Sequence, residues 1–337
     1  MNSRKNSTYI IAEAGVNHDG SLTKAKKLID VAKSSGADAV KFQTFSAENL
    51  ATINSPKANY QLGNNKNESQ YRMLKRLELT KENHFILKKY CKKKKIEFIS
   101  SAFSLEDIDF LNRLNLKTFK IPSGEINNRP YLEKIGKLNK KVILSTGMAT
   151  VNEISHAIKL LIYSGLKKKK ISLLHCVSEY PADIKNLNLR FIRFLEKNFE
   201  LNIGFSDHST SIIVPSLAVS VGAKIIEKHL TLSNSLNGPD HKSSLNPNNF
   251  RKMILMVRQA EKALGLEKKR ISKEESQNRL VVRKSIVAKK NIKKNEILSY
   301  ENITFKRPGK GISPMKIYNF LGKRSKKNFK KDEYIKW

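Results

Sequence analysis

Cysteine is scarce in this chain, since its 337 residues contain only two, Cys91 and Cys176. Two cysteines build no disulfide framework, and this pair is not spaced as a CxxC metal motif. Long apolar runs are missing as well, because no window approaches the ~18 apolar residues of a membrane span. The first residues turn polar again after a short apolar stretch. These absences predict a cytoplasmic protein that is neither exported nor inserted in a membrane.

Acidic residues are also few: 30 Asp and Glu stand against 65 Lys and Arg, and the formal net charge is +35. Such a balance is typical of proteins that bind polyanions. The chain has no aromatic-rich RNA-binding motif, zinc-finger spacing or helix-turn-helix pattern, however, so we expect no nucleic-acid partner. The lysine runs 88–95 and 166–170 precede predicted strands, where lysine meets the negative end of a helix dipole. The charge is thus either functional or a composition bias of an A/T-rich genome.

Short apolar runs rich in β-branched residues recur along most of the chain, with helical stretches between them. This alternation predicts a parallel sheet. Eight strands close a (β/α)8, or TIM, barrel, and a doubly wound open sheet is the rival arrangement. The predicted strands are 9–14, 38–43, 96–101, 117–122, 141–146, 171–176, 202–206 and 224–229.

The pattern changes after Gly265, where a polar stretch is followed by short β-like runs broken by turn residues. We therefore predict a barrel domain over 1–265, a linker over 266–282 and a small β-rich module over 283–337. A module of this size is marginally stable by itself and gains from packing against another surface. Residues 45–69 are Asn-rich and long for a βα loop, which favours a place in a functional site.

Polar residues follow every predicted strand, and in a TIM barrel the chemistry lies at these carboxyl ends. Lys41 and Lys120 stand inside otherwise apolar strands, and serines end several others. Ammonium groups and hydroxyls together bind phosphate and carboxylate oxygens. Because the chain has no P-loop, the pattern predicts an anion site that is not a nucleotide site.

His229 ends the last predicted strand, and His208 follows shortly after the end of the strand before it. Either residue alone could be a hydrogen-bonded core histidine. On neighbouring strands, two neutral imidazoles can share a divalent ion and leave positions for water and substrate. A metal-dependent hydrolase could use the same pair, but such enzymes usually have further ligands and the first strand carries no HxH pair. Asp240 lies in a GPD turn, where its carboxylate could accept hydrogen bonds from sugar hydroxyls.

Ten segments, in order along nearly the whole chain, resemble the bacterial sialic acid (N-acetylneuraminate) synthases and their relatives, the N,N'-diacetyllegionaminate synthases. The resemblance implies a TIM barrel followed by an antifreeze-like (SAF) domain. The segments are IAEAGVNHDG, AVKFQTF, FKIPSGEINN, ILSTGM, LHCVSEYP, FSDHS, IEKHLTL, GPDHKSSL, RKSIVA and KRPGKGISPM.

The resemblance also implies the reaction, in which phosphoenolpyruvate condenses with an N-acyl hexosamine such as N-acetylmannosamine to give N-acetylneuraminate and phosphate. The alternative is the N,N'-diacetyllegionaminate branch, which the segments HCVSEYP and GPDHKSSL also suit. A divalent metal is implied, Mn²⁺ first, with Mg²⁺ or Co²⁺ as alternatives. A homodimer with exchanged SAF domains is implied as well.

Site roles follow from the same resemblance. Lys41 and Lys120 would hold phosphoenolpyruvate, and Glu125 would face the sugar or the reaction centre. We assign these three residues to the catalytic group and expect Glu125 to transfer a proton, because it is a partly buried carboxylate near the expected anions. His208 and His229 would hold the metal. The substrate-binding residues would be Glu13, Gln43, Asn64, Ser101, Ser123, Ser145, Ser178, Tyr180, Ser206, Asp240 and Arg307.

Two positions depart from the family pattern. Ser178 stands where an amide or threonine is common, and Ser101 stands where threonine followed by proline is usual. Both departures keep a hydroxyl near the expected anion site, so they bear on affinity more than on activity.

Overall fold

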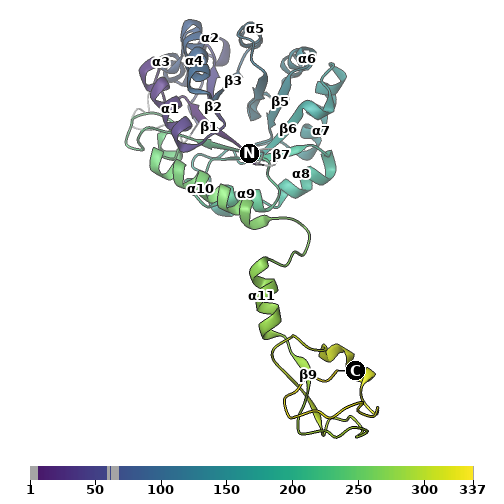
Figure 1. Cartoon of the computed structure of the whole chain (residues 1–337). Coiled ribbons are helices and arrows are strands. Elements are labelled where there is room, and N and C mark those ends of the chain that lie inside the picture. Colours follow the sequence, from purple (N-terminus) through teal and green to yellow (C-terminus); the bar gives the residue numbers. More distant parts are fainter. Residues whose placement is uncertain (1–6, 59–60, 62–67, 337) are drawn as a thin grey trace. The chain divides into compact units, whose positions relative to one another are not determined.

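The computed structural model describes residues 7–58, 61 and 68–336. The chain divides into two compact units, Met1–Gly265 and Leu266–Trp337, and each is described by itself (Figure 1). None of the helices in these ranges is both long and apolar enough to cross a membrane.

The first unit is a TIM barrel. Its eight strands are parallel and close in sequence order, with β1 paired to both β2 and β8. The prediction of a closed barrel is confirmed, and the predicted strands agree with the observed ones to within one or two residues. The strands are β1 (Tyr9–Gly15), β2 (Ala39–Thr44), β3 (Glu97–Ala102), β4 (Thr118–Ile121), β5 (Lys141–Ser145), β6 (Ile171–Cys176), β7 (Asn202–Asp207) and β8 (Ile225–His229).

Helices surround the strands (Figure 1). The long connection between β2 and β3 carries three of them, of which only the short α2 lies within the Asn-rich segment 45–69. The helices are α1 (Leu22–Ser35), α2 (Ala47–Leu50), α3 (Gln70–Leu77), α4 (Lys81–Lys94), α5 (Leu105–Arg113), α6 (Arg129–Leu138), α7 (Val151–Tyr163), α8 (Phe191–Phe199), α9 (Val214–Ser220) and α10 (Pro247–Leu264).

Capping residues fix where several helices begin and end. Thr150 and Glu153 form a complete capping box at the start of α7. Ser104 caps α5 through its side chain, which accepts from the backbone N–H of Asp107. Gly36 ends α1 in the left-handed region, at φ 96°. Local sequence therefore sets the register of each βα unit before any long-range contact forms.

The barrel interior changes character along its axis. The layer nearer the amino ends of the strands is apolar and consists of Ile11, Ala39, Ile99, Ile143, Leu174 and Ile225. Two residues further along these six strands, the same face carries Glu13, Lys41, Ser101, Ser145, Cys176 and Glu227. Since side chains alternate with a period of two in a strand, each of the six contributes first to the core and then to a polar chamber.

The second unit has its own small core, which includes Ile286, Ile303 and Phe329. Strands β9 (Ser285–Ala288) and β10 (Ile303–Lys306) form an antiparallel pair, and a 3-10 helix, η6, spans Pro314–Asn319. The segment expected to be a linker, 266–282, contains helix α11 (Lys273–Val282), which begins at a Ser272–Glu275 capping box.

Candidate active site

Two buried lysines and two buried glutamates meet inside the barrel, toward the carboxyl ends of its strands. Lys41 Nζ lies 3.0 Å from Glu13 Oε2 and 3.6 Å from Glu227 Oε2. Lys120 Nζ lies 3.6 Å from Glu227 Oε1. Glu227 thus bridges the two ammonium groups, and none of the four side chains is more than 5% exposed.

Serine hydroxyls surround this charged cluster. Lys120 Nζ donates to Ser145 Oγ at 2.7 Å, and Lys41 Nζ donates to Ser101 Oγ at 3.4 Å. Ser206 Oγ donates to Glu227 Oε1 at 2.9 Å. The structure therefore brings together five residues that the sequence suggested for an anion site, from five different strands or strand ends.

The pKa values of the four charged groups diverge. Burial raises the pKa of Glu13 to about 7, although Lys41 opposes the shift. Burial also acts to raise the pKa of Glu227, but Lys120 and Lys41 outweigh it and hold that pKa at about 2. Burial lowers the pKa of Lys120; burial acts in the same direction on Lys41, but Glu13 and Glu227 overcome it and raise that pKa. The chamber thus holds two lysine ammonium groups, the carboxylate of Glu227, which is ionised at neutral pH, and the carboxyl of Glu13, which titrates near pH 7. This balance of charge favours the binding of an added anion.

Each of the two carboxylates in the cluster has one oxygen without a full set of hydrogen bonds. Oε2 of Glu13 and Oε2 of Glu227 are buried atoms that face Lys41 as ions but have no well-aligned hydrogen-bond partner among the described residues. The charge of Lys41 compensates both oxygens.

His208 and His229 lie beside this cluster with ring centroids 5.5 Å apart. Tyr180 stacks on His208 at 4.1 Å, and the Tyr180 hydroxyl lies 3.2 Å from His208 Nε2. The other ring nitrogen of His208, Nδ1, lies 2.6 Å from the carbonyl oxygen of Val177. A proton on Nδ1 donates to that carbonyl, which leaves Nε2 as the acceptor that faces the hydroxyls of Tyr180 and Ser206.

Both imidazoles are held neutral. Burial lowers the pKa of His208 to about 4, and burial together with His208 lowers the pKa of His229 well below its usual value. His229 Nδ1 is buried, has no hydrogen-bond partner among the described residues, and lies 3.8 Å from Asp240 Oδ2. Neutral imidazole nitrogens of this kind fit a transition-metal ion.

The histidine pair does not form a complete cage. Within residues 7–58, 61 and 68–336, no group of three or more His, Cys, Asp and Glu side chains is arranged to hold a metal. An ion bound by the two imidazoles would therefore take its other ligands from water or substrate, which suits a catalytic site better than a structural one.

Glycine at position 15 lets three polar side chains converge beside the histidines. Gly15 has φ +50°, and a Cβ there would lie 3.2 Å from Glu13 Oε1, 3.4 Å from Asp240 Oδ2 and 3.6 Å from Gln43 Nε2. Burial raises the pKa of Asp240 to about 6. Glu13, Gln43 and Asp240 thus form a hydrogen-bonding wall next to the charged cluster.

Ser123 and Ser178 meet at a second close approach of the backbone. Gly147 N donates to Ser123 Oγ at 2.9 Å. A Cβ at position 147 would lie 2.3 Å from Ser178 Oγ and 2.9 Å from Ser123 Oγ, so a larger residue there would displace both hydroxyls. Two hydroxyls and a backbone amide are therefore gathered at the ends of β4, β5 and β6.

Among the described residues of the first unit, one predicted residue stands apart from this constellation. Glu125 is half-buried in a 3-10 turn, where its Oε2 accepts from Asn128 Nδ2 at 2.6 Å, and no ion pair joins it to either lysine within the described ranges. Arg307 belongs to the second unit, directly after β10. Asn64 lies outside the described residues.

Glu227 is the functional candidate that the sequence analysis did not select. It lies between Ile226 and Lys228 in β8, and its side chain lies between Lys41 and Lys120. A signal was present in the sequence, because two lysines buried inside one barrel require a compensating carboxylate. The segment EKH places that carboxylate two residues before His229, on the same face of the strand.

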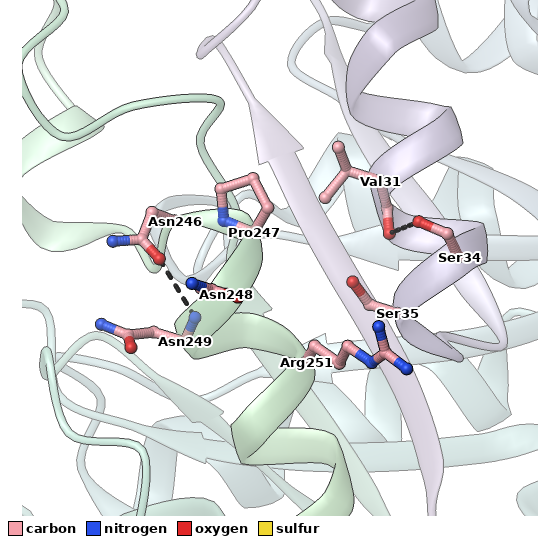
Figure 2. A pocket seen from close by; sticks show the side chains of 8 residues that line it. All are labelled: Val31, Ser34, Ser35, Asn246, Pro247, Asn248, Asn249 and Arg251. Carbon is pink, nitrogen blue, oxygen red and sulfur yellow. Dashed lines mark hydrogen bonds between the residues drawn. The ribbon is translucent and has the colours of Figure 1, made fainter.

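A surface pocket of about 540 Å³ lies elsewhere, between the end of α1 and the start of α10 (Figure 2). Its polar groups serve the two helices. Asn246 accepts from Asn249 N as the N-cap of α10, and Ser34 Oγ donates to the carbonyl of Val31. The pocket is lined by Val31, Ser34, Ser35, Asn246, Pro247, Asn248, Asn249 and Arg251.

Comparison with known families agrees with this geometry. A match to the NeuB family covers residues 28–269. The chain belongs to the NeuB family. A match to the SAF domain covers residues 283–337, so the second unit of this NeuB-family chain contains a SAF domain.

Two relatives and one solved structure are similar to this chain over 90% or more of their own length. The N,N'-diacetyllegionaminic acid synthase of Campylobacter jejuni is 52% identical over 98% of this chain and 99% of its own. The synthase of the same name from Legionella pneumophila is 43% identical over 98% of this chain and 93% of its own. The solved N-acetylneuraminic acid synthetase of Leptospira borgpetersenii, in complex with citrate, is 35% identical, has a TM-score of 0.71, and is matched over 81% of this chain and 90% of its own. The first two names favour the legionaminate alternative over the sialic acid expectation.

Proposed function

We propose that this protein is a nonulosonic acid synthase that condenses phosphoenolpyruvate with a 6-deoxy di-N-acetylated hexose. The products are N,N'-diacetyllegionaminic acid and phosphate. The observation that carries the proposal is the buried pair of Lys41 and Lys120, bridged by Glu227 and ringed by serines, next to two neutral histidines. The names of the two relatives above support the choice of sugar.

The lysines and serines would hold phosphoenolpyruvate. A phosphate or carboxylate entering the chamber can take hydrogen bonds from the ammonium groups that now face Glu227 and from the hydroxyls of Ser101, Ser145 and Ser206. Charge-assisted hydrogen bonds of this kind are about twice as strong as neutral ones. Fixing both substrates also removes much of the entropy cost of a reaction between two molecules.

The bond changes follow from the two substrates. C3 of phosphoenolpyruvate attacks the aldehyde carbon of the open-chain sugar, and a carbon–carbon bond forms. Water then adds to C2, and the bond from C2 to the phosphate oxygen breaks, which releases phosphate and leaves a 2-keto acid. Glu13 suits the proton transfers, because a pKa of about 7 lets it hold or release a proton at neutral pH. Glu125, which the sequence analysis expected to transfer a proton, is the second candidate for the same role.

The sugar would lie against the wall formed by Glu13, Gln43 and Asp240, with Tyr180 beside His208. The carboxylates of this wall can accept from sugar hydroxyls, and the Gln43 amide can also donate to an N-acyl oxygen. His208 and His229 would hold a divalent ion, Mn²⁺ first, with Mg²⁺ or Co²⁺ as alternatives. When bound, such an ion supplies Lewis acidity to the carbonyl oxygen of the sugar.

We also propose a homodimer in which Arg307 of the partner subunit reaches the N-acyl group of the sugar. The family resemblance supports this arrangement. Loss of activity in Arg307→Ala, with activity regained when that chain is mixed with a second inactive chain altered only at Lys120, would identify a shared site. Failure of every mixture to regain activity would contradict it.

N-acetylneuraminate synthesis is the second candidate, favoured by the Leptospira borgpetersenii structure. The deciding experiment measures product mass and released phosphate after incubation with phosphoenolpyruvate, a divalent metal and one of three sugars. These are N-acetylmannosamine, its 6-phosphate, and the 6-deoxy di-N-acetylated hexose. We expect product from the last sugar. Product from N-acetylmannosamine alone would favour the second candidate, and no product from any sugar would refute the synthase.

A further inference from the structure

Behind the two histidines lies an ion pair that the mechanism above does not use. Lys228 Nζ lies 2.6 Å from Asp207 Oδ2, and both side chains are 0% exposed. The two residues are direct partners in the register between β7 and β8. They share the outward face of their strands with Phe205 and Ile226, which belong to the core between strands and helices.

The same two side chains hold the turn that carries His208. Asp207 Oδ1 accepts from the backbone N–H of Ser209 at 2.9 Å. Lys228 Nζ donates to the carbonyl oxygen of Ser209 as well as to Asp207. Asp207 and Ser209, the two neighbours of His208, are thus both bound to Lys228, which directly precedes His229.

This arrangement links the positions of the two imidazoles. In a strand, a shift of one residue moves each side chain to the opposite face. Asp207 and Lys228 face outward, so their pairing in register directs His208 and His229 inward at the same level. The ion pair therefore acts on the two residues proposed to hold a metal, although it touches neither ring.

The energetics indicate positioning more than stability. Replacing a buried ion pair with apolar side chains is often neutral or stabilising, because desolvation offsets the attraction between the charges. A core position between Phe205 and the barrel helices would accept an aliphatic side chain. Lys228 is nevertheless fully buried at this position, and both of its partners lie in the turn that carries His208. The geometry that Lys228 imposes on this turn explains why a lysine is present there.

We propose that Lys228 is a positioning residue that, through Asp207 and Ser209, fixes His208 opposite His229. The inference rests on the proposed function for the role of the two histidines. Its rival is that other contacts suffice, since Val177 O contacts the His208 ring and Ala182 N donates to the His208 carbonyl at 3.0 Å.

The test compares three variants of the full chain. Lys228→Met removes the ammonium group, and the double variant Lys228→Met/Asp207→Asn also removes the buried charge that would be left unpaired. The side-chain oxygen of the amide introduced by Asp207→Asn can still accept from Ser209 N, so the double variant isolates the loss of the ammonium group. Leu173→Ala is the matched control, because it creates a cavity in the same outer core, in β6, away from the histidines.

The first measurement is direct binding of Mn²⁺ and Co²⁺ by calorimetry, with the visible spectrum of Co²⁺ as a report on ligand geometry. We expect both Lys228 variants to bind about 10- to 100-fold more weakly than the parent chain, as is typical when a residue that orients a ligand is lost. We expect the spectrum to change with it. Leu173→Ala should unfold at a lower temperature but bind metal as the parent does. Parental affinity and spectrum in the double variant would overturn the inference.

The second measurement does not depend on metal. Crystal structures of the parent and the double variant, both without metal, should differ in the His208 turn and in the separation of the two imidazoles. An unchanged turn and ring separation would overturn the positioning role. If the parent binds no metal but the turn shifts in the variant, the metal proposal fails while the positioning role stands.

Discussion

Lysine serves opposite purposes at the two ends of the barrel. At the carboxyl end of the strands, Lys41 and Lys120 are buried and face Glu13 and Glu227. At the amino end, lysines crowd the last turn of α4 and the 3-10 helix η3 (Lys168–Lys170), just before β3 and β6. There they are mostly exposed, as in the pair of Lys168 with Glu200, whose side chains are 49% and 82% exposed.

The difference shows that charge alone does not reveal function in this protein. An exposed lysine at a helix end interacts weakly with the helix dipole and is screened by salt. A buried lysine must be compensated, and it retains its full attraction for an anion in a medium of low dielectric constant. The net charge of +35 therefore says less about the substrate than the two lysines inside the strands do.

The largest expected effect separates the two ends directly. Lys120→Met should lower kcat/KM for phosphoenolpyruvate by about 10²- to 10³-fold, the loss typical when a donor to a reacting group is removed from a buried site. Lys93→Met, at the exposed end of α4, should leave it unchanged. Steady-state phosphate release measures both. Continued turnover by Lys120→Met would favour a metal-dependent hydrolase.

Removal of a histidine at the carboxyl end of the strands should weaken metal binding. His229→Ala should weaken Mn²⁺ binding by at least about 100-fold, because only one imidazole remains and the loss exceeds that of an orienting residue. The control is His156→Ala, at an exposed position on α7. Calorimetric titration checks both chains, and equal affinity in the two would refute the metal site.

The pH dependence of stability should also distinguish the buried end. The pKa of Glu13 is raised to about 7 in the folded chain, from 4.5. The folded state thus holds this proton more tightly, and its stabilising contribution is complete below pH 4.5 and is lost as pH rises through 7. At about 1.4 kcal/mol per pKa unit, the unfolding free energy of the parent should fall by about 3 kcal/mol relative to Glu13→Gln over this range.

Urea denaturation at a series of pH values measures that difference. Glu106→Gln, at an exposed position in the first turn of α5, should show no such fall relative to the parent. A difference between parent and Glu13→Gln that stays constant or grows with pH would contradict the raised pKa.

The smallest expected effect belongs to the exposed end. Lys93→Ala should reduce the unfolding free energy by about 0.3 to 1 kcal/mol at low ionic strength, because a cation is lost near the negative end of α4. The effect should vanish in high salt. Thermal unfolding in low and high salt checks this, and a salt-independent loss would indicate packing instead of the dipole.

The sequence allowed the barrel to be predicted because its signals are local. Apolar β-branched runs located every strand, and caps such as Thr150 and Gly36 marked helix boundaries. Lys41 and Lys120 could be selected because a lysine within an apolar strand is conspicuous. Glu227 was not selected, because glutamate beside lysine in the segment EKH looks like an ordinary polar strand end.

The order of strands and helices, the two units and the residue types available at each strand end can be derived from the sequence. Which of these residues meet depends on the tertiary structure. Glu227 lies 186 positions from Lys41, and barrel closure between β8 and β1 brings them within 3.6 Å. The pKa of Glu13, the facing imidazoles and the Lys228–Asp207 pair depend likewise on register and burial, which arise only when all eight strands close.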